Sequence, residues 1–373
     1  MALSRLILKQ IISPDMRKRK HFGLISLAIL AILIKIFSLS PETVEHYYSD
    51  GFYPFISKAQ RILIGWIPFS IGDILYFLTG LYLLLKTAGF IKRIIRRKID
   101  RSYLLHVGKK VLGFALVIYI LFNVLWGLNY NRVGIAKQLQ LTREEVLTPD
   151  LMNVMQQIVY RINALDSLAG GNRLALKKKK NLFQGSVFSY QTLAEQNTLF
   201  KYSRVSVKPS LYSYLGNYMG FSGYYNPFSG EAQVNTTVPV FIQPFITCHE
   251  IGHQLGYAKE SEANFAGYLS ASSSTNPAFR YSAYFDLYLY GRRYVYLLDS
   301  LKGKQLDNQL NPGVRKDIRD LREFVNRHAN PIEKIIDLLY SQFLKANEQP
   351  AGRVSYSEVI VWVIAYYKKY GQI

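Results

Sequence analysis

Three apolar stretches in the first third of the chain restrict its possible folds more than any other feature. They cover residues 22–39, 74–91 and 111–128, and each is 18 residues long. A helix rises 1.5 Å per residue, so each stretch can reach about 27 Å, close to the hydrocarbon thickness of a bilayer. We therefore expect a membrane domain with three transmembrane helices over residues 1–128 and a second domain over residues 129–373.

Basic residues are distributed unevenly around these stretches. They gather before the first stretch and between the second and third, whereas the loop between the first and second has two basic residues against three acidic ones. The positive-inside rule places both basic segments in the cytoplasm and residues 129–373 on the extracytoplasmic side of the membrane. The first stretch is long for a cleaved signal peptide and is followed by Pro41, so we expect an uncleaved anchor.

The formal net charge of +21 does not by itself indicate a nucleic-acid-binding protein. Residues 1–128 contribute +12 of it, which the membrane topology explains. The second domain has one continuous block of basic residues, at 177–180. The simplest interpretation of this block is a solvated loop. We expect the lipid bilayer as a partner, and no nucleic acid.

The segment HEIGH at residues 249–253 has the spacing of a zinc site on a helix. His249 and His253 lie on one helical face, where both imidazoles can bind one ion, and Glu250 can reach a water molecule beside it. Gly256 follows where the helix would end, because glycine adopts the left-handed conformation of a helix cap. The motif predicts bound Zn²⁺ with both histidines as ligands.

A catalytic zinc ion takes three protein ligands and keeps one position open. We expect Glu260 as the third ligand, because on a helix it shares a face with Asn264, whose amide could support a ligand. Glu262 is rotated by about 200° from Glu260 and is the alternative. His328 lies in a polar segment and is expected to be solvated, with a role at a reaction oxyanion as the less favoured interpretation.

Glu250 has the chemistry of a general base for amide hydrolysis, because a carboxylate beside a zinc-activated water can accept its proton. Tyr224 and Tyr225, in a hairpin before the motif, are the first candidates for stabilising the oxyanion. We also expect residues 232–236 to form an edge strand that binds an extended substrate by backbone pairing.

The second domain has a mainly helical pattern with a small β-hairpin, which predicts an α+β fold. Apolar periodicity and helix-start signals predict a hairpin over 221–237 and helices near 149–165, 276–301, 312–327, 331–346 and 355–370. The tyrosine-rich stretch 281–296 is expected in the core. Cys248, the single cysteine, points away from the ligand face and is expected to be a small buried residue.

The sequence Glu260-x-x-Ala263-Asn264 is similar to the Glu-x-x-(Ser/Ala)-Asp signature of gluzincin metallopeptidases. The resemblance implies that Glu260 is the third ligand and that Asn264 supports a histidine. Asn264 departs from the usual aspartate, and the gap from His253 to Glu260 is far shorter than in thermolysin-like enzymes. The third histidine of a metzincin would fall at Lys259, which excludes that family.

The whole chain, including the segment NVLWGLNY at residues 123–130, resembles an uncharacterised bacterial family of membrane-anchored proteins with a zinc-peptidase site. The resemblance implies a zinc peptidase and supplies no substrate. From the extracytoplasmic location we expect hydrolysis of amide bonds in a peptide or protein of the cell envelope. A zinc-containing envelope sensor or binding protein without hydrolytic activity is the alternative. Glu250 favours the enzyme, because binding alone would not need a general base.

The predicted orientation can be tested by cysteine-accessibility labelling in a Cys248→Ser background. A cysteine near Lys178 should react with a membrane-impermeant maleimide from outside, whereas a cysteine near Arg96 should react only after the inner membrane is opened. Labelling near Lys178 that requires opening of the membrane would reverse the orientation.

Overall fold

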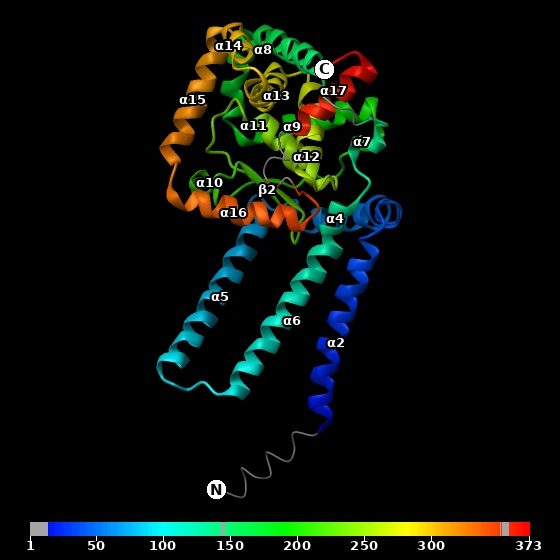
Figure 1. Ribbon diagram of the computed structural model, residues 1–373, viewed down its shortest axis with the longest axis vertical. Helices are drawn as coiled ribbons and strands as arrows, with labels where there is room; N and C mark the ends of the chain where they lie inside the picture. The colour runs from blue at the N-terminus through cyan, green and yellow to red at the C-terminus, as the bar shows by residue number, and fades with distance from the viewer. Residues whose placement is uncertain (1–13, 143–145, 351, 353–357) are drawn as a thin grey trace, which may run out of the picture.

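The computed structural model describes residues 14–142, 146–350, 352 and 358–373. These residues are mostly helical and include one small mixed sheet, which confirms the predicted α+β class. Figure 1 shows three long helices, α2, α5 and α6, extending from one side of a globular body that the rest of the chain forms.

Two or three of the long helices are able to cross a membrane. By length and composition, α5 (Ile71–Ile95) and α6 (Arg101–Leu125) each qualify alone. Within α2 (Pro14–Phe37), the part Phe22–Phe37 qualifies together with Pro41–Ile64, from which it is bent by 101°. α6 ends before the predicted limit of residue 128, because Trp126 leaves the helical conformation and its indole is buried in the globular body. These helices indicate a membrane protein.

The connection between α2 and α5 lies across the membrane-facing side of the globular body (Figure 1). Its Tyr48 and Tyr53 share an apolar cluster with Trp126, and buried Arg132 forms an ion pair with Glu45, with Nη2 and Oε1 2.7 Å apart. The membrane-proximal segments and the globular body therefore share a core. The connection consists of α3 (Pro41–Thr43), the π-helix η1 (Val44–Phe52) and α4 (Tyr53–Ile64).

The sheet has the strand order β1-β3-β2, with β1 parallel and β2 antiparallel to β3. The strands are β1 (Val207–Pro209), β2 (Gly223–Asn226) and β3 (Glu231–Val234). β2 and β3 confirm the predicted hairpin, but the expectation of a substrate-binding edge strand at 232–236 is wrong. β3 is central and fully buried, and its backbone groups already pair with both neighbours. β1 and β2 are the strands at the edges of the sheet.

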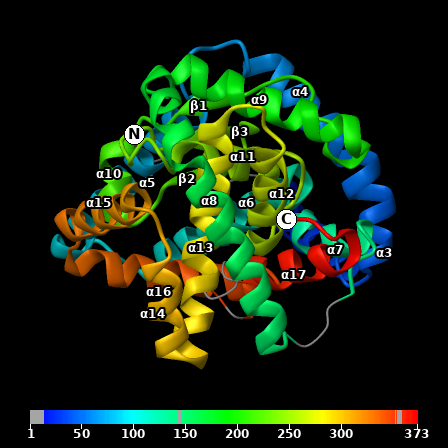
Figure 2. The same cartoon turned by 90° about the horizontal axis from the view of Figure 1, so that it is seen from above.

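The helix that carries the HEIGH motif, α11, lies inside the globular body, where α9, α12, α13 and the sheet pack around it (Figure 2). Tyr281, Tyr284 and Tyr288 of α13 are buried, as predicted for this stretch. The five predicted helices are present, although the first continues to Leu176, the second is divided at Asp299, and residues 355–357 of the last prediction lie outside the described part. The helix Lys179–Gln196 was not predicted. The helices of the globular body are η2 (Gly127–Asn131), α7 (Ile135–Gln138), α8 (Thr148–Leu176), α9 (Lys179–Gln196), η3 (Thr198–Phe200), α10 (Ser213–Met219), α11 (Gln243–Gln254), α12 (Glu260–Ser272), α13 (Pro277–Leu298), α14 (Ser300–Asn308), α15 (Pro312–His328), α16 (Pro331–Ala346) and α17 (Val359–Tyr370).

Glu231 connects the sheet to the membrane helix α5. Its buried carboxylate accepts hydrogen bonds from the backbone N–H groups of Ile71 and Gly72, at 3.1 Å and 2.7 Å, and from the Ser70 hydroxyl at 3.2 Å. The first N–H groups of a helix have no partner within it, and a negative charge there also complements the helix dipole. Glu231 therefore fixes the start of α5 against the sheet.

Replacement of Glu231 by alanine should lower the free energy of unfolding by about 1–3 kcal/mol, because buried N–H donors lose their acceptor. Thermal unfolding of the purified protein in detergent measures the effect. Glu42→Ala is the matched control, since this glutamate of α3 is exposed, and its loss should leave the unfolding temperature unchanged. Equal unfolding temperatures for both variants would contradict an anchoring role for Glu231.

Candidate metal centre

The residues of the predicted zinc site come from two helices that approach each other closely. Gly256 ends α11 with φ of +88°, as predicted, and a side chain there would lie 3.0–3.2 Å from three neighbouring side chains. Gly267 of α12 permits the close approach, because a Cβ at this position would be 2.9 Å from the backbone nitrogen of His249. The short connection and the close packing bring the start of α12 beside the histidines of α11.

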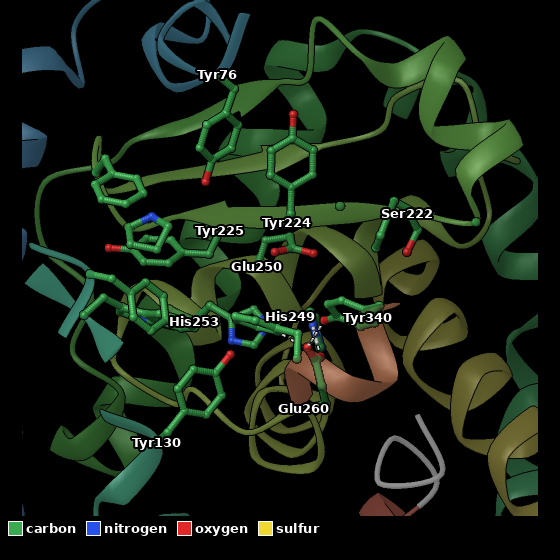
Figure 3. Close-up of a pocket in the computed structure, with 18 of the residues that line it drawn as sticks. Tyr76, Tyr130, Ser222, Tyr224, Tyr225, His249, Glu250, His253, Glu260 and Tyr340 are labelled. Atoms are coloured by element: carbon green, nitrogen blue, oxygen red, sulfur yellow. Dashed lines mark hydrogen bonds and ion pairs between the residues drawn. The ribbon is translucent and has the colours of Figure 1, made fainter. Parts of the chain in front are cut away.

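The structure brings His249, His253 and Glu260 together (Figure 3). Oε2 of Glu260 lies 3.3 Å from Nε2 of His249 and 3.6 Å from Nε2 of His253. Two ligand atoms that are each about 2.1 Å from a tetrahedral zinc ion lie about 3.4 Å apart. Both distances from Glu260 to the histidines are therefore compatible with a metal ion held in common.

Neighbouring groups orient these three side chains for metal binding. Nδ1 of His253 lies 2.8 Å from the carbonyl oxygen of Tyr257, so Nδ1 carries the proton and Nε2 is left to bind a metal. The side chain of Asn264 interacts with His249, as expected from its position on α12. The Tyr340 hydroxyl donates to Oε1 of Glu260 at 2.6 Å, and Oε2 faces the histidines.

Burial and the close contact of these groups determine their charges. Burial lowers the pKa of His249 and so favours the neutral imidazole that binds metals. Burial opposes the ionisation of Glu260, but hydrogen bonds to His249 and His253 outweigh it and hold the pKa of this carboxyl well below its usual range. Burial opposes a charge on His253, but its contacts with Glu260 outweigh this and raise its pKa, so metal binding would release a proton there. Zinc takes a carboxylate and neutral imidazoles as ligands.

Glu250 is placed beside the triad but is not held by it. Its ligand atoms and those of the two histidines lie within 4.8 Å of one another. Oε2 of Glu250 is buried and has no hydrogen-bond partner among the described residues, and burial raises the pKa of this carboxyl to about 8. Gly223 of β2 makes room for it, because a Cβ there would be 2.4 Å from Oε1 of Glu250.

The triad and Glu250 line one pocket of about 910 Å³. The pocket is bounded by β2, by α11, α12, α13 and α16, and by the membrane helices α5 and α6 (Figure 3). Its polar lining includes Ser222, Arg293 and Tyr340, in addition to the metal-site residues. It is therefore large enough to receive several residues of a substrate.

The two alternative ligands lie elsewhere. Glu262 is buried on another side of α12, where its Oε1 approaches Gly134 and its charge interacts with Lys259 and Arg132. His328 packs its ring against Tyr218 and Phe324 and does not line the pocket. The geometry favours Glu260 over both.

The tyrosines that the sequence suggested for an oxyanion site are engaged in other contacts. The hydroxyl of Tyr224 hydrogen-bonds to Asp73 and Ser210, and that of Tyr225 lies 3.5 Å from the Tyr53 hydroxyl. Figure 3 shows both hydroxyls directed away from the imidazoles, whereas the hydroxyl of Tyr130 points toward them. Burial, and secondly the charge of Glu260, raises the pKa of Tyr130, so this hydroxyl keeps its proton and can donate it.

Cys248 faces away from the metal centre. It is buried between α11, α9 and α12, where the Ser270 hydroxyl lies 3.7 Å from its sulfur. Burial raises the pKa of the thiol to about 12. The predicted role of Cys248 as a small buried residue is confirmed.

Comparison with known proteins identifies one family. A family model described as "Protein of unknown function (DUF3810)" matches residues 48–364, which include the metal centre, α5, α6 and most of the globular body. No curated protein and no solved structure matches the chain.

The metal content of four variants tests the ligand assignment. We expect one zinc ion per purified chain, and loss of most of it in His249→Ala, His253→Ala and Glu260→Gln, because each removes one of three ligands. Glu262→Gln is the matched control and should retain the metal. Mass spectrometry of metals gives the stoichiometry. Full occupancy in Glu260→Gln together with loss in Glu262→Gln would transfer the ligand role to Glu262.

Proposed function

The chain belongs to the DUF3810 family of proteins of unknown function, and we propose that it is a membrane-anchored zinc peptidase that hydrolyses amide bonds of a protein or peptide in the cell envelope. The observation that carries the proposal is the position of Glu250. Its buried carboxylate lies beside three side chains with zinc-ligand spacing, in the same pocket. From this position the carboxylate can act on a water molecule at a metal ion held by the three side chains.

The residues of the metal centre have different roles in the proposed amide hydrolysis. Zinc bound by His249, His253 and Glu260 would lower the pKa of a water molecule and polarise the substrate carbonyl. Glu250 is placed to take a proton from the attacking water and deliver it to the leaving amine. Burial raises the pKa of this carboxyl to about 8 without a metal, and a cation bound beside it would lower that value and favour the carboxylate that acts as base.

Two tyrosines support the reaction in this proposal. The Tyr130 hydroxyl points toward the imidazoles and can donate a hydrogen bond to the oxyanion that forms on the substrate carbonyl. The Tyr340 hydroxyl fixes the Glu260 carboxylate through Oε1. Tyr340 belongs to α16 and Tyr130 follows α6, so segments far apart in the sequence complete the site.

The proposed location is the extracytoplasmic side of a bacterial inner membrane. The support for it is the excess of basic residues before residue 22 and around the connection of α5 to α6, which the positive-inside rule assigns to the cytoplasm. The metal centre lies at the opposite ends of α5 and α6 (Figure 1). A substrate would therefore reach it from the cell envelope.

Replacing Glu250 by glutamine separates a peptidase from a zinc-containing binding protein or sensor. The amide keeps the size of the carboxylate but cannot accept a proton, so turnover should fall by about 10²- to 10⁴-fold while zinc is retained. Envelope peptides and muropeptides that accumulate in Glu250→Gln cells identify the substrate, and rates are then measured with the purified protein.

Glu262→Gln is the control and should retain activity. If Glu250→Gln fully complements a deletion strain and His249→Ala does not, the zinc is structural and the chain is a binding or signalling protein. Loss of zinc from Glu250→Gln would make Glu250 a fourth ligand and close the open position that hydrolysis needs.

A further inference from the structure

The pocket at the metal centre continues along the membrane helices. Its lining includes Tyr76 of α5 and Phe114, Ile118 and Phe122 of α6. The three α6 residues are four positions apart, so they lie along one face of the helix, and Trp126 follows with the same spacing. From Phe114 to Trp126 the helix rises about 18 Å, more than half of a hydrocarbon core of about 30 Å. The lining therefore continues from the globular body along the membrane-spanning part of α6.

The inner end of this stripe touches a metal-site residue. Trp126 donates its indole N–H to the carbonyl oxygen of His253 at 3.0 Å, and the two rings are 5.9 Å apart between centroids. Phe122 also contacts Phe343 of α16, with centroids 6.3 Å apart. One continuous aromatic surface thus connects the lipid-facing part of α6 to the metal centre.

The outer part of the cleft is open to lipid. The apolar windows of α5 and α6 are not buried by other parts of the protein, and Phe114 and Ile118 are exposed. The lining residues of this part are aromatic or aliphatic, whereas the end at the metal has the polar residues Glu250, Arg293 and Tyr340. The pocket as a whole therefore suits a molecule with an apolar tail and a polar peptide.

The apolar part of the pocket shares a volume of about 910 Å³ with the polar part at the metal. An acyl chain is a single file of methylene groups and is much thinner than a helix, which is about 10 Å wide. We therefore take an acyl chain as the tail, and competition with a single-span peptide tests a transmembrane helix as the alternative.

We propose that the substrate is a lipid-modified peptide or protein whose acyl chain enters the cleft between α5 and α6 from the bilayer, while its peptide portion reaches the metal centre. The hydrolytic part of this statement rests on the proposed peptidase function, but binding of the acyl chain does not require catalysis. The cleft positions the substrate through its lipid and leaves the chemistry to the metal centre.

Photo-crosslinking tests the cleft independently of activity. Full-length Glu250→Gln protein in nanodiscs of phosphatidylglycerol and phosphatidylcholine is given an N-palmitoyl tetrapeptide with a diazirine near the end of its acyl chain. Cross-links should map to residues 114–122 of α6. Excess unlabelled N-palmitoyl peptide should compete, and the same peptide without the palmitoyl group should not.

Two tryptophan variants provide the matched comparison. Ile118→Trp fills the cleft and should lower the competed labelling at least tenfold. Leu121→Trp adds the same indole to α6 outside the cleft, at a residue of similar exposure (42% for Leu121 and 37% for Ile118), and should leave labelling unchanged. Both variants should bind as much zinc as the parent protein, which shows that they fold. A second cleft variant, Ala115→Trp, should behave like Ile118→Trp.

Three outcomes would overturn the acyl-chain proposal. They are labelling of α6 without competition, equal labelling in both tryptophan variants, and competition by a hydrophobic single-span peptide. Cleavage of unacylated peptides by the wild-type protein, without competed labelling, would reject the cleft and keep the peptidase. Competed labelling with no cleavage of any acylated or unacylated peptide library would keep the cleft and reject the peptidase.

Discussion

The carbonyl oxygens at the C-terminal end of α11 join the membrane-proximal segments to the metal centre. Tyr53 and Arg61 of α4 donate to the Gln254 carbonyl at 2.8 Å and 3.2 Å, and Trp126 donates to the His253 carbonyl. The last carbonyl groups of a helix have no partner within it and bear partial negative charge, so aromatic and cationic donors stabilise them. Because these donors come from the ends of the membrane segments, the metal-site helix is held at a fixed position beside the bilayer. A pocket shared between the metal centre and the membrane helices follows from this attachment.

The same arrangement explains why so many polar groups are buried at the centre. Two carboxylates and two imidazoles lie together with little contact with solvent. Burying a carboxylate without compensation is costly, and each of these carboxylates gains most from a cation at their common centre. Glu260 is compensated in part by the two histidines and Tyr340, whereas Oε2 of Glu250 has no such partner among the described residues. Groups kept in this state are characteristic of reactive sites.

The sequence was most informative where local rules decide the structure. Helix spacing brought His249 and His253 to one face, and the left-handed Gly256 was predicted because a helix must end there. Apolar length and charge outlined the membrane helices, but not the break at Trp126, which depends on a hydrogen bond to a helix more than a hundred residues away.

The central position of β3 was missed because it requires a parallel partner, β1, that precedes the hairpin. Tyr340 was missed for the same reason, since its contact with Glu260 spans 80 residues. Tyr130 lay within a segment that had been singled out, but its direction toward the site depends on tertiary packing.

Zinc-edge X-ray absorption of the purified full-length protein tests the central claim most directly. The account predicts one zinc ion with two imidazole nitrogens and one carboxylate oxygen from the chain, and one further oxygen from exchangeable solvent. In Glu250→Gln this spectrum should be unchanged, and in Glu260→Gln the carboxylate contribution should be lost. A sulfur ligand, a fourth ligand from Glu250, or a spectrum that does not respond to the Glu260 substitution would contradict the assignment of an open, catalytic zinc site.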